Sequence, residues 1–167
     1  WQKSAAEVLY VGSMPIARIT KEGDAYYVVA GGSTEYTIHF DTIDNPSDLY
    51  SAQVVDTIQV SGGQDGMVSI ESATINPNST DCAGITAAGA TISPFLPSSK
   101  QLTFNFPNAR TGCTFEAKVK LKINKNILSN TSITDFAEIT TVDGAKANAQ
   151  FTTLAIGPFA QEKRGGD

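Results

Sequence analysis

Charged residues are scarce in this chain of 167 residues: they make up 17% of the sequence, against roughly a quarter in an average soluble domain. Thr, Ser, Asn, Gln and Gly take their place, and this uncharged polar composition favours strands and turns over helices. The net charge of −5 argues against nucleic acid and anionic membranes as partners. No apolar run approaches the roughly 18 residues of a membrane-spanning helix, so we expect no membrane span.

Histidine and cysteine are scarce as well, which argues against several kinds of catalytic site. The single histidine, His39, falls on the polar side of an alternating stretch, and no Ser-His-Asp arrangement is implied. A zinc site needs about three or four clustered His and Cys ligands, whereas the one His and two Cys are scattered along this chain. No glycine-rich phosphate loop precedes a helix. We therefore expect no enzymatic activity and no cofactor.

The two cysteines, Cys82 and Cys113, lie far apart in the sequence. In a chain so rich in Thr, Ser and Asn, the pair favours a disulfide and an oxidising compartment. Closing a loop of this size would stabilise the fold by about 3–4 kcal/mol in the chain-entropy model. Two buried free thiols are the alternative interpretation. If the protein is secreted, the sequence corresponds to its mature form beginning at Trp1.

The clearest strand runs from Cys113 to Ile123, where apolar and polar residues alternate over the whole segment. One face must therefore be core, and the other, which carries Lys118, Lys120 and Lys122, must be solvated. Lysines on an outer face also discourage edge-to-edge aggregation. A binding patch for an acidic partner is the alternative reading of this ridge.

Similar alternating stretches recur between turn signals, and no stretch has a convincing helical period. Pro107, Gly62-Gly63, Asn76-Pro77, Asp143-Gly144 and Gly157-Pro158 end five of them. A long connection, 80–99, is expected to hold one short strand at 90–93. About eight to ten short strands with regular turns predict an all-β protein with a Greek-key β-sandwich.

Three further groups of residues are candidate sites of weak specificity. Asn78 and Asn130 begin Asn-X-Ser/Thr sequences in turn-like stretches and are candidates for glycosylation. Asp41, Asp44 and Asp48 crowd one loop and are weak candidates for calcium; a solvated turn is the better interpretation, and we expect no metal. Asp135, Glu138 and Asp143 lie along a strand and its turn, so they need not converge.

A covalent cross-link is a further hypothesis, because some surface sandwiches join a strand lysine to an Asn or Asp with the help of a buried acid. Lys21 near the first core strand, Glu138 and Asn148 would be the participants here. Alternation directs Glu138 outward, which argues against this set.

Four short motifs give the chain a family resemblance: Ile19-Thr20-Lys21, Ala30-Gly31, Tyr36-Thr37-Ile38 and Asp56-Thr57-Ile58. With the late segment 130–144, they resemble a bacterial and archaeal surface repeat catalogued as domain of unknown function eleven. The resemblance covers residues 17–156 and implies an immunoglobulin-like sandwich, an envelope or extracellular location and no catalysis. Gln59 replaces the proline of that pattern, and neither cysteine belongs to it.

The segment before the resemblance, residues 1–16, is itself strand-like. Val8, Leu9, Tyr10 and Val11 form an apolar stretch in which both faces are partly apolar. The segment can add an edge strand to its own domain or complete the sheet of another copy, as in donor-strand pili. Head-to-tail exchange of this kind propagates as a fibre. We divide the chain into a candidate donor arm (1–16), an immunoglobulin-like sandwich (17–157) and a polar tail (158–167).

These observations predict a secreted structural subunit of an extracellular, pilus-like filament or surface layer, whose partners are other copies of itself. The alternative is a stalk or adhesion module of a larger surface protein that binds glycans through exposed aromatics. Tyr26, Tyr27 and Tyr50 are the candidates for that role, although alternation predicts that about half of them belong to the core.

Overall fold

The computed structural model describes residues 17–41, 52–75, 91–93, 100–106, 114–141, 144 and 146–157. These residues form ten strands and one short 3-10 turn, and no α-helix occurs among them. The elements in chain order are β1 (Arg18–Gly23), β2 (Tyr27–Val29), β3 (Ser33–Asp41), β4 (Ala52–Val60), η1 (Asp65–Met67), β5 (Val68–Ile75), β6 (Thr91–Ile92), β7 (Gln101–Phe106), β8 (Thr114–Ile123), β9 (Ser132–Thr141) and β10 (Lys146–Ile156).

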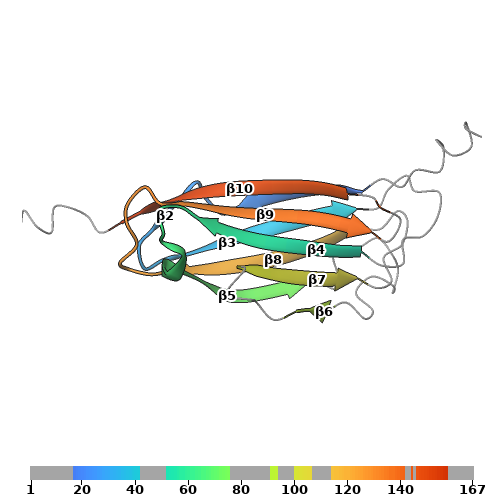
Figure 1. Cartoon of the computed structure of the whole chain (residues 1–167), viewed down its shortest axis with the longest axis horizontal. Coiled ribbons are helices and arrows are strands. Elements are labelled where there is room, and N and C mark those ends of the chain that lie inside the picture. The colour runs from blue at the N-terminus through green and yellow to red at the C-terminus, as the bar shows by residue number, and fades with distance from the viewer. Residues whose placement is uncertain are drawn as a thin grey trace, which may run out of the picture.

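The strands make two sheets that pack face to face as an elongated sandwich (Figure 1). The four-stranded sheet has the order β1-β3-β8-β5, and the six-stranded sheet has the order β2-β10-β9-β4-β7-β6. Neighbouring strands are antiparallel except β2, which runs parallel to the end of β10. This architecture confirms the all-β sandwich predicted from the alternating sequence.

Alternation along each strand decides which side chains enter the core. In β8, the residues Phe115, Ala117, Val119, Leu121 and Ile123 are buried, and the lysines between them lie on the outer face, as predicted. The outer ridge is solvated: Lys118 and Lys120 lie 3.9 and 3.1 Å from the carboxylates of Glu35 and Glu71. Exposed ion pairs of this kind contribute little to stability.

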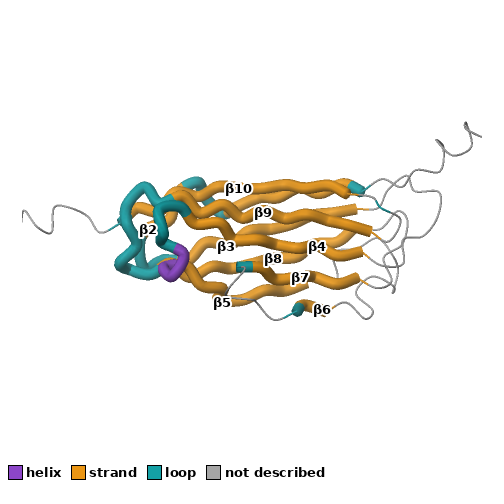
Figure 2. Tube along the Cα trace, viewed as in Figure 1, coloured by secondary structure: helices purple, strands orange, loops and turns teal. Residues whose placement is uncertain are grey.

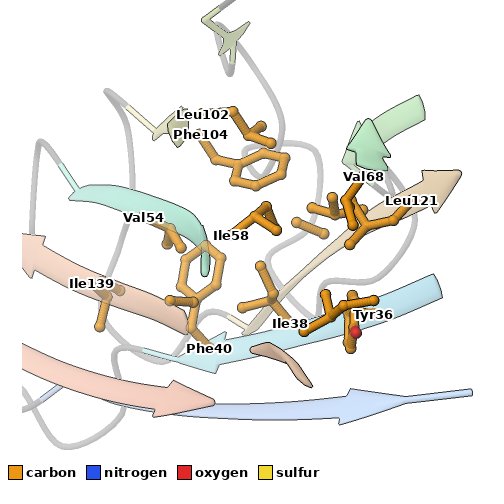
Figure 3. Close-up of a cluster of buried hydrophobic side chains, with 14 of the residues drawn as sticks. Tyr36, Ile38, Phe40, Val54, Ile58, Val68, Leu102, Phe104, Leu121 and Ile139 are labelled. Carbon is orange, nitrogen blue, oxygen red and sulfur yellow. The ribbon is translucent and has the colours of Figure 1, made fainter. Parts of the chain in front are cut away.

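The core lies between the two sheets and is filled from both (Figure 3). Val54, Ile58 and Phe104 reach it from the six-stranded sheet and meet Ile38 and Leu121 from the four-stranded sheet. At one end of the core, the rings of Phe40, Phe106 and Phe115 pack with centroids 4.8–4.9 Å apart. Aromatic groups of this kind contribute large apolar areas to the core.

The strand β5 forms one edge of the four-stranded sheet and carries a β-bulge. Its pairing with β8 shifts between Ile70 and Ser72, so Glu71 is an extra residue on the β5 side. Because Ile70 and Ala73 are three residues apart, a regular strand would place them on opposite faces. The bulge compensates for this spacing, so the side chains of Ile70 and Ala73 both face the sandwich interior.

Most of the described loop residues and η1 gather at one end of the sandwich (Figure 2). There the turn between β2 and β3 contains Gly31 with φ of 85°, a left-handed conformation that glycine adopts without strain. Within the described part of the chain, no helix is long and apolar enough to span a bilayer.

Candidate functional site

A lysine side chain is completely buried between two aspartates inside the sandwich. Nζ of Lys21 lies 2.5 Å from Oδ1 of Asp56 and 2.5 Å from Oδ1 of Asp135, and all three side chains are 0% exposed. Lys21 comes from β1 in one sheet, and the aspartates come from the neighbouring strands β4 and β9 in the other. The contacts therefore cross the core and connect the two sheets.

The strand register explains why these three residues meet. On β4, Asp56 occupies the same inward phase as Val54 and Ile58, and Asp135 occupies the inward phase of β9. Asp56 is paired with Ala137, two residues beyond Asp135, so the carboxyl groups lie diagonally on one face of the sheet. Lys21 faces them because it too falls on the inward phase of its strand.

Burial makes the charge balance of this site important. One lysine and two ionised aspartates would leave a net negative charge in the dry core, where an uncompensated charge is very unfavourable. Burial, followed by the charge of Asp56, raises the pKa of Asp135 well above its ordinary value. One proton on the pair of aspartates makes the site neutral, and the raised pKa of Asp135 favours that carboxyl as the place of the proton.

The second oxygen of each carboxyl is a further distinctive feature. Oδ2 of Asp56 and Oδ2 of Asp135 are buried, and neither has a hydrogen-bond partner among the described residues. Most buried polar atoms in folded proteins have such a partner. Both carboxyls thus contact the same amine through Oδ1 and keep a second oxygen free to hold or release a proton.

Tyr36 closes the site on the side of the four-stranded sheet. Nζ of Lys21 lies 5.8 Å from the centroid of the Tyr36 ring, within the range of a cation–π interaction. The Tyr36 hydroxyl donates a hydrogen bond of 2.8 Å to Oγ1 of Thr153, and burial raises the pKa of Tyr36 well above its ordinary value. The tyrosine therefore stays neutral and shields the lysine from water.

The arrangement brings an amine nitrogen, a neutral carboxyl and a second carboxyl together without solvent. Both carboxyl oxygens are within hydrogen-bond distance of Nζ, so a proton can pass between these groups without a bridging water. Among the described residues, no group of three or more His, Cys, Asp or Glu side chains is placed to hold a metal ion. The chemistry of the site is that of an amine and two carboxylic acids.

The cross-link participants expected from the sequence are only partly right. Lys21 is buried and paired, but Glu138 lies on the outer side of β9, as alternation predicted, opposite the exposed Asn148 on β10. Neither can reach Lys21 across the sheet. Asp135, which the sequence placed in a weak acidic group with Glu138, belongs to the core instead.

Several other predicted site residues fall outside the described residues. They are Cys82 and Cys113, the arm residues Val8, Leu9, Tyr10 and Val11, the glycosylation candidate Asn78, and Asp44, Asp48 and Asp143. Asp41 ends β3, and its side chain is also outside the described set. The disulfide and the donor strand therefore stay predictions, and the structure does not test the weak calcium candidates.

Asn130 and His39 are described, and both lie at the surface. Asn130 is exposed in a turn with φ of 68°, and its backbone amide donates a hydrogen bond to the carbonyl of Ala155. The exposure suits a glycan, although glycosylation itself stays a prediction. His39 lies on the outer face of β3, and its Nδ1 is 3.7 Å from a carboxylate oxygen of Glu116, in agreement with the surface position predicted for it.

The sequence held a signal for the buried site that the strand analysis did not use. Asp56 and Asp135 interrupt the apolar phase of their strands, at positions where every neighbour of the same phase is hydrophobic. A charged residue on a buried strand face requires a buried partner of opposite charge. Lys21 shares the inward phase of its strand with Ile19 and is likewise a charged residue on a buried face. Two of the four motifs behind the family resemblance, Ile19-Thr20-Lys21 and Asp56-Thr57-Ile58, contain these charged residues.

Comparison with known proteins identifies the fold. The major pilin SpaD of Corynebacterium diphtheriae matches with a TM-score of 0.61 and 11% identity over 83% of this chain and 34% of that chain. The major pilin subunit BcpA of Bacillus cereus matches with a TM-score of 0.56 and 12% identity over 84% of this chain and 40% of that chain. A cohesin module of a family 33 glycoside hydrolase from Clostridium perfringens matches with a TM-score of 0.55 and 12% identity over 87% of this chain and 99% of that chain.

These likenesses establish an immunoglobulin-like sandwich of the kind found in pilins and cohesins. The chain spans 34% of the length of one of these pilins and 40% of the other. No protein-family model and no curated protein sequence matches the chain. The resemblance to domain of unknown function eleven is therefore not confirmed.

Proposed function

We propose that the chain is a structural, non-enzymatic subunit of an extracellular filament or surface layer, in which copies associate by β-strand complementation. The donor is the arm of residues 1–16, and the acceptor is the open side of the sandwich along β5 of a neighbouring copy. The fold shared with pilin domains supports this proposal, and the low identity means that the mode of assembly must be argued from this chain alone.

The observation that carries the proposal is the incomplete burial of β5. Its inward residues Ile70, Ala73 and Ile75 are only half-buried. Their partners on β8 are completely buried, although both sets face the same interior. Within the described part of the chain, β5 is the last strand on this side of its sheet. An added strand alongside β5 would cover these apolar side chains and satisfy its outer backbone groups.

A closely packed, largely apolar seam without room for a water molecule lies next to this edge, between β4 of one sheet and β5 of the other. Ile58 and Val60 line it from the six-stranded sheet, and Val68, Ile70 and Leu121 line it from the four-stranded sheet. In Figure 1, β5 lies with β7 and β6 along one long side of the sandwich, away from β10. A strand added along β5 would therefore lie beside a largely apolar seam rather than fill a preformed cavity.

The arm has the pattern that this acceptor requires. Val8, Leu9, Tyr10 and Val11 offer apolar side chains in both phases, so one set would face the half-buried residues of β5 in either register. Main-chain hydrogen bonds would supply affinity, and the side-chain fit would supply register. Because the donor arm and the acceptor strand are different segments of the chain, each added copy would leave a new acceptor, and the assembly would grow as a fibre.

Size-exclusion chromatography and electron microscopy of the full chain and of a chain lacking residues 1–16 test the proposal. We expect filaments from the full chain and monomers from the truncated one. A synthetic peptide of residues 1–16 should bind the truncated chain. Monomers at high concentration and empty grids for the full chain, or filaments from the truncated chain, would overturn the proposal.

A matched pair of variants tests the acceptor. Ile75→Asp places a charge on the inward face of β5, whereas Thr74→Asp places the same charge on the adjacent exposed position. We expect Ile75→Asp to abolish assembly and Thr74→Asp to leave it intact, with both variants folded by circular dichroism. If the two variants assembled equally well, β5 would not be the acceptor strand.

A glycan-binding adhesion module is the second candidate function, and exposed aromatics favour it. Tyr26 and Tyr27 are 70% and 62% exposed, and Tyr50, the third candidate from the sequence, lies outside the described residues. Tyr26 stacks on Phe151 with ring centroids 5.2 Å apart, which holds it in place as a flat surface for a sugar ring. Glycan-array binding that survives deletion of residues 1–16 and is lost in Tyr26→Ala would support this candidate.

A further inference from the structure

We infer that Lys21 and Asp135 form an intramolecular isopeptide bond, with Asp56 as the proton-transfer group. The bond would join Nζ of Lys21 on β1 to Cγ of Asp135 on β9, two strands of opposite sheets. The participants differ from those that the sequence suggested, because the strand register brings together one lysine and two aspartates. The reaction occurs within one copy, so it stands independently of filament assembly.

Proximity is the first requirement of this reaction, and the structure meets it. Nζ is 2.5 Å from a carboxyl oxygen of each aspartate, so the nitrogen lies next to a carboxyl carbon. Groups held in such contact react as if at very high concentration, because no translational or rotational entropy remains to be lost. The three strands that carry these residues are each held by backbone pairing along their length.

The protonation states are the second requirement. A lysine is a nucleophile only as the neutral amine, and a carboxyl accepts a nucleophile readily only in its neutral form. Burial is the main cause of the raised pKa of Asp135, and this shift agrees with a protonated carboxyl there. Asp56 is then the carboxylate that takes the proton from the lysine ammonium.

The steps balance without any external reagent. The Asp56 carboxylate removes one proton from the Lys21 ammonium, and the freed nitrogen lone pair attacks Cγ of the protonated Asp135 carboxyl. In the tetrahedral intermediate, Asp56 moves a proton from nitrogen to a hydroxyl on Cγ. The carbon–oxygen bond then breaks, water leaves, and the nitrogen–carbon bond remains as an amide. Asp56 ends protonated, and the net charge of the site stays zero throughout.

The environment favours the product. Before reaction the core contains an ammonium and a carboxylate, both desolvated; afterwards it contains a neutral amide and a neutral acid that can hydrogen-bond to each other. Removing buried charges relieves the desolvation penalty of the ion pair. The complete burial of all three side chains also keeps water from hydrolysing the intermediate.

The choice of Asp135 over Asp56 as the acceptor follows from the asymmetry between the two carboxyls. Asp135 is the one whose neutral form the surroundings favour, and its link to Lys21 spans a sequence separation of 114 residues, against 35 for Asp56. A Lys21–Asp135 bond would therefore tie the first described strand to the ninth and oppose separation of the two sheets.

Intact-mass spectrometry of the folded protein under reducing conditions tests the inference. We expect a mass lower than that of the sequence by one water molecule, and a Lys21→Arg variant with the full mass. Peptide mapping should yield a branched peptide in which Lys21 resists trypsin and is attached to Asp135. A folded protein of full mass would overturn the inference, as would a branch at Asp56 or an equal mass loss in Lys21→Arg.

Two variants of the aspartates separate their roles. Asp135→Asn should still form the amide, now releasing ammonia, so its product has the same mass as the wild-type product. Asp56→Asn keeps the acceptor and the volume of the side chain but removes the proton-transfer group, and we expect a large loss of cross-linked product. Full cross-linking in Asp56→Asn would exclude the assigned role of Asp56. Succinimide formation at Asp65-Gly66 also releases one water molecule. This mass loss does not depend on Lys21, so it would persist in Lys21→Arg, whereas the loss from the isopeptide bond would not.

Discussion

The hydroxyl of Tyr36 on β3 donates a hydrogen bond of 2.8 Å to Oγ1 of Thr153 on β10. The bond joins the two sheets beside the buried lysine, because β3 and β10 belong to different sheets. Thr153 also donates a long hydrogen bond of 3.4 Å to the carbonyl of Ala25. The two hydroxyls therefore differ: Thr153 keeps its bond to Ala25 when Tyr36 loses its hydroxyl, whereas the Tyr36 hydroxyl makes no second hydrogen bond within the described part of the chain.

Replacing Tyr36 by Phe should destabilise the protein only modestly, by about 1 kcal/mol, because the ring stays in place and Thr153 keeps its bond to Ala25. Thr153→Val should cost more, about 1–3 kcal/mol, because it leaves the buried Tyr36 hydroxyl without its partner. The double variant should cost less than the sum of the single variants. Urea unfolding measures all three, and a larger loss for Tyr36→Phe than for Thr153→Val would contradict this asymmetry.

Gly23 should not tolerate a side chain. A Cβ at this position would lie 2.5 Å from a ring carbon of Phe151, and this ring packs against Tyr26 and Tyr36 with centroids 5.2 and 6.0 Å away. Gly23→Ala should therefore cost about 1–3 kcal/mol through displacement of the ring.

Gly66 provides the matched control for that substitution. A Cβ there would meet no atom within 4 Å, and its φ is not positive. Gly66→Ala should be neutral or slightly stabilising, because it lowers the conformational entropy of the unfolded chain. Thermal unfolding of the two variants compares them directly, and equal midpoints would show that Phe151 yields without cost.

Deleting Glu71 should preserve the fold. The deletion brings Ile70 and Ala73 to a spacing of two, so Val68, Ile70, Ala73 and Ile75 would share one face without the bulge. The deleted residue contributes only an exposed ion pair with Lys120, which is worth about 0–1 kcal/mol. We expect unchanged circular dichroism and a free energy of unfolding within about 1 kcal/mol of the original; loss of cooperative unfolding would contradict the phase argument.

The buried aspartates should make stability depend on pH when the amide cannot form. In Lys21→Met, burial and the charge of Asp56 still raise the pKa of Asp135 above its ordinary value of 3.8, and the lysine that opposes this shift is gone. The native state then binds the proton more tightly than the unfolded state does. The stabilising contribution is complete below the unfolded pKa and is lost as pH rises through the folded pKa.

The free energy of unfolding of Lys21→Met should therefore fall as pH rises above about 3.8, by about 1.4 kcal/mol for each unit of pKa shift. Lys21→Met/Asp135→Asn removes this titrating group at nearly constant volume, and its pH profile should be flatter. Denaturant unfolding across the acid-to-neutral range measures both profiles. Parallel profiles would show that Asp135 titrates normally.

The sequence by itself determined the fold class, because a period of two specifies which residues face the core wherever one face is buried. The alternation around Phe115 and Leu121 predicted β8 and its solvated lysines, and turn residues such as Gly31 marked strand ends. The sequence also showed Asp56 and Asp135 as charged residues on strand faces that are otherwise mostly apolar.

Only the tertiary structure decided which charges meet. Pairing between β4 and β9 sets the two carboxyls diagonally on one face, and packing of the sheets brings Lys21 over them. Alternation states whether a side chain faces inward but not which strand lies opposite, because sheet order and packing depend on contacts between residues far apart in the chain. For the same reason the half-buried inward face of β5, on which the proposed assembly rests, became visible only once the order of the strands was known.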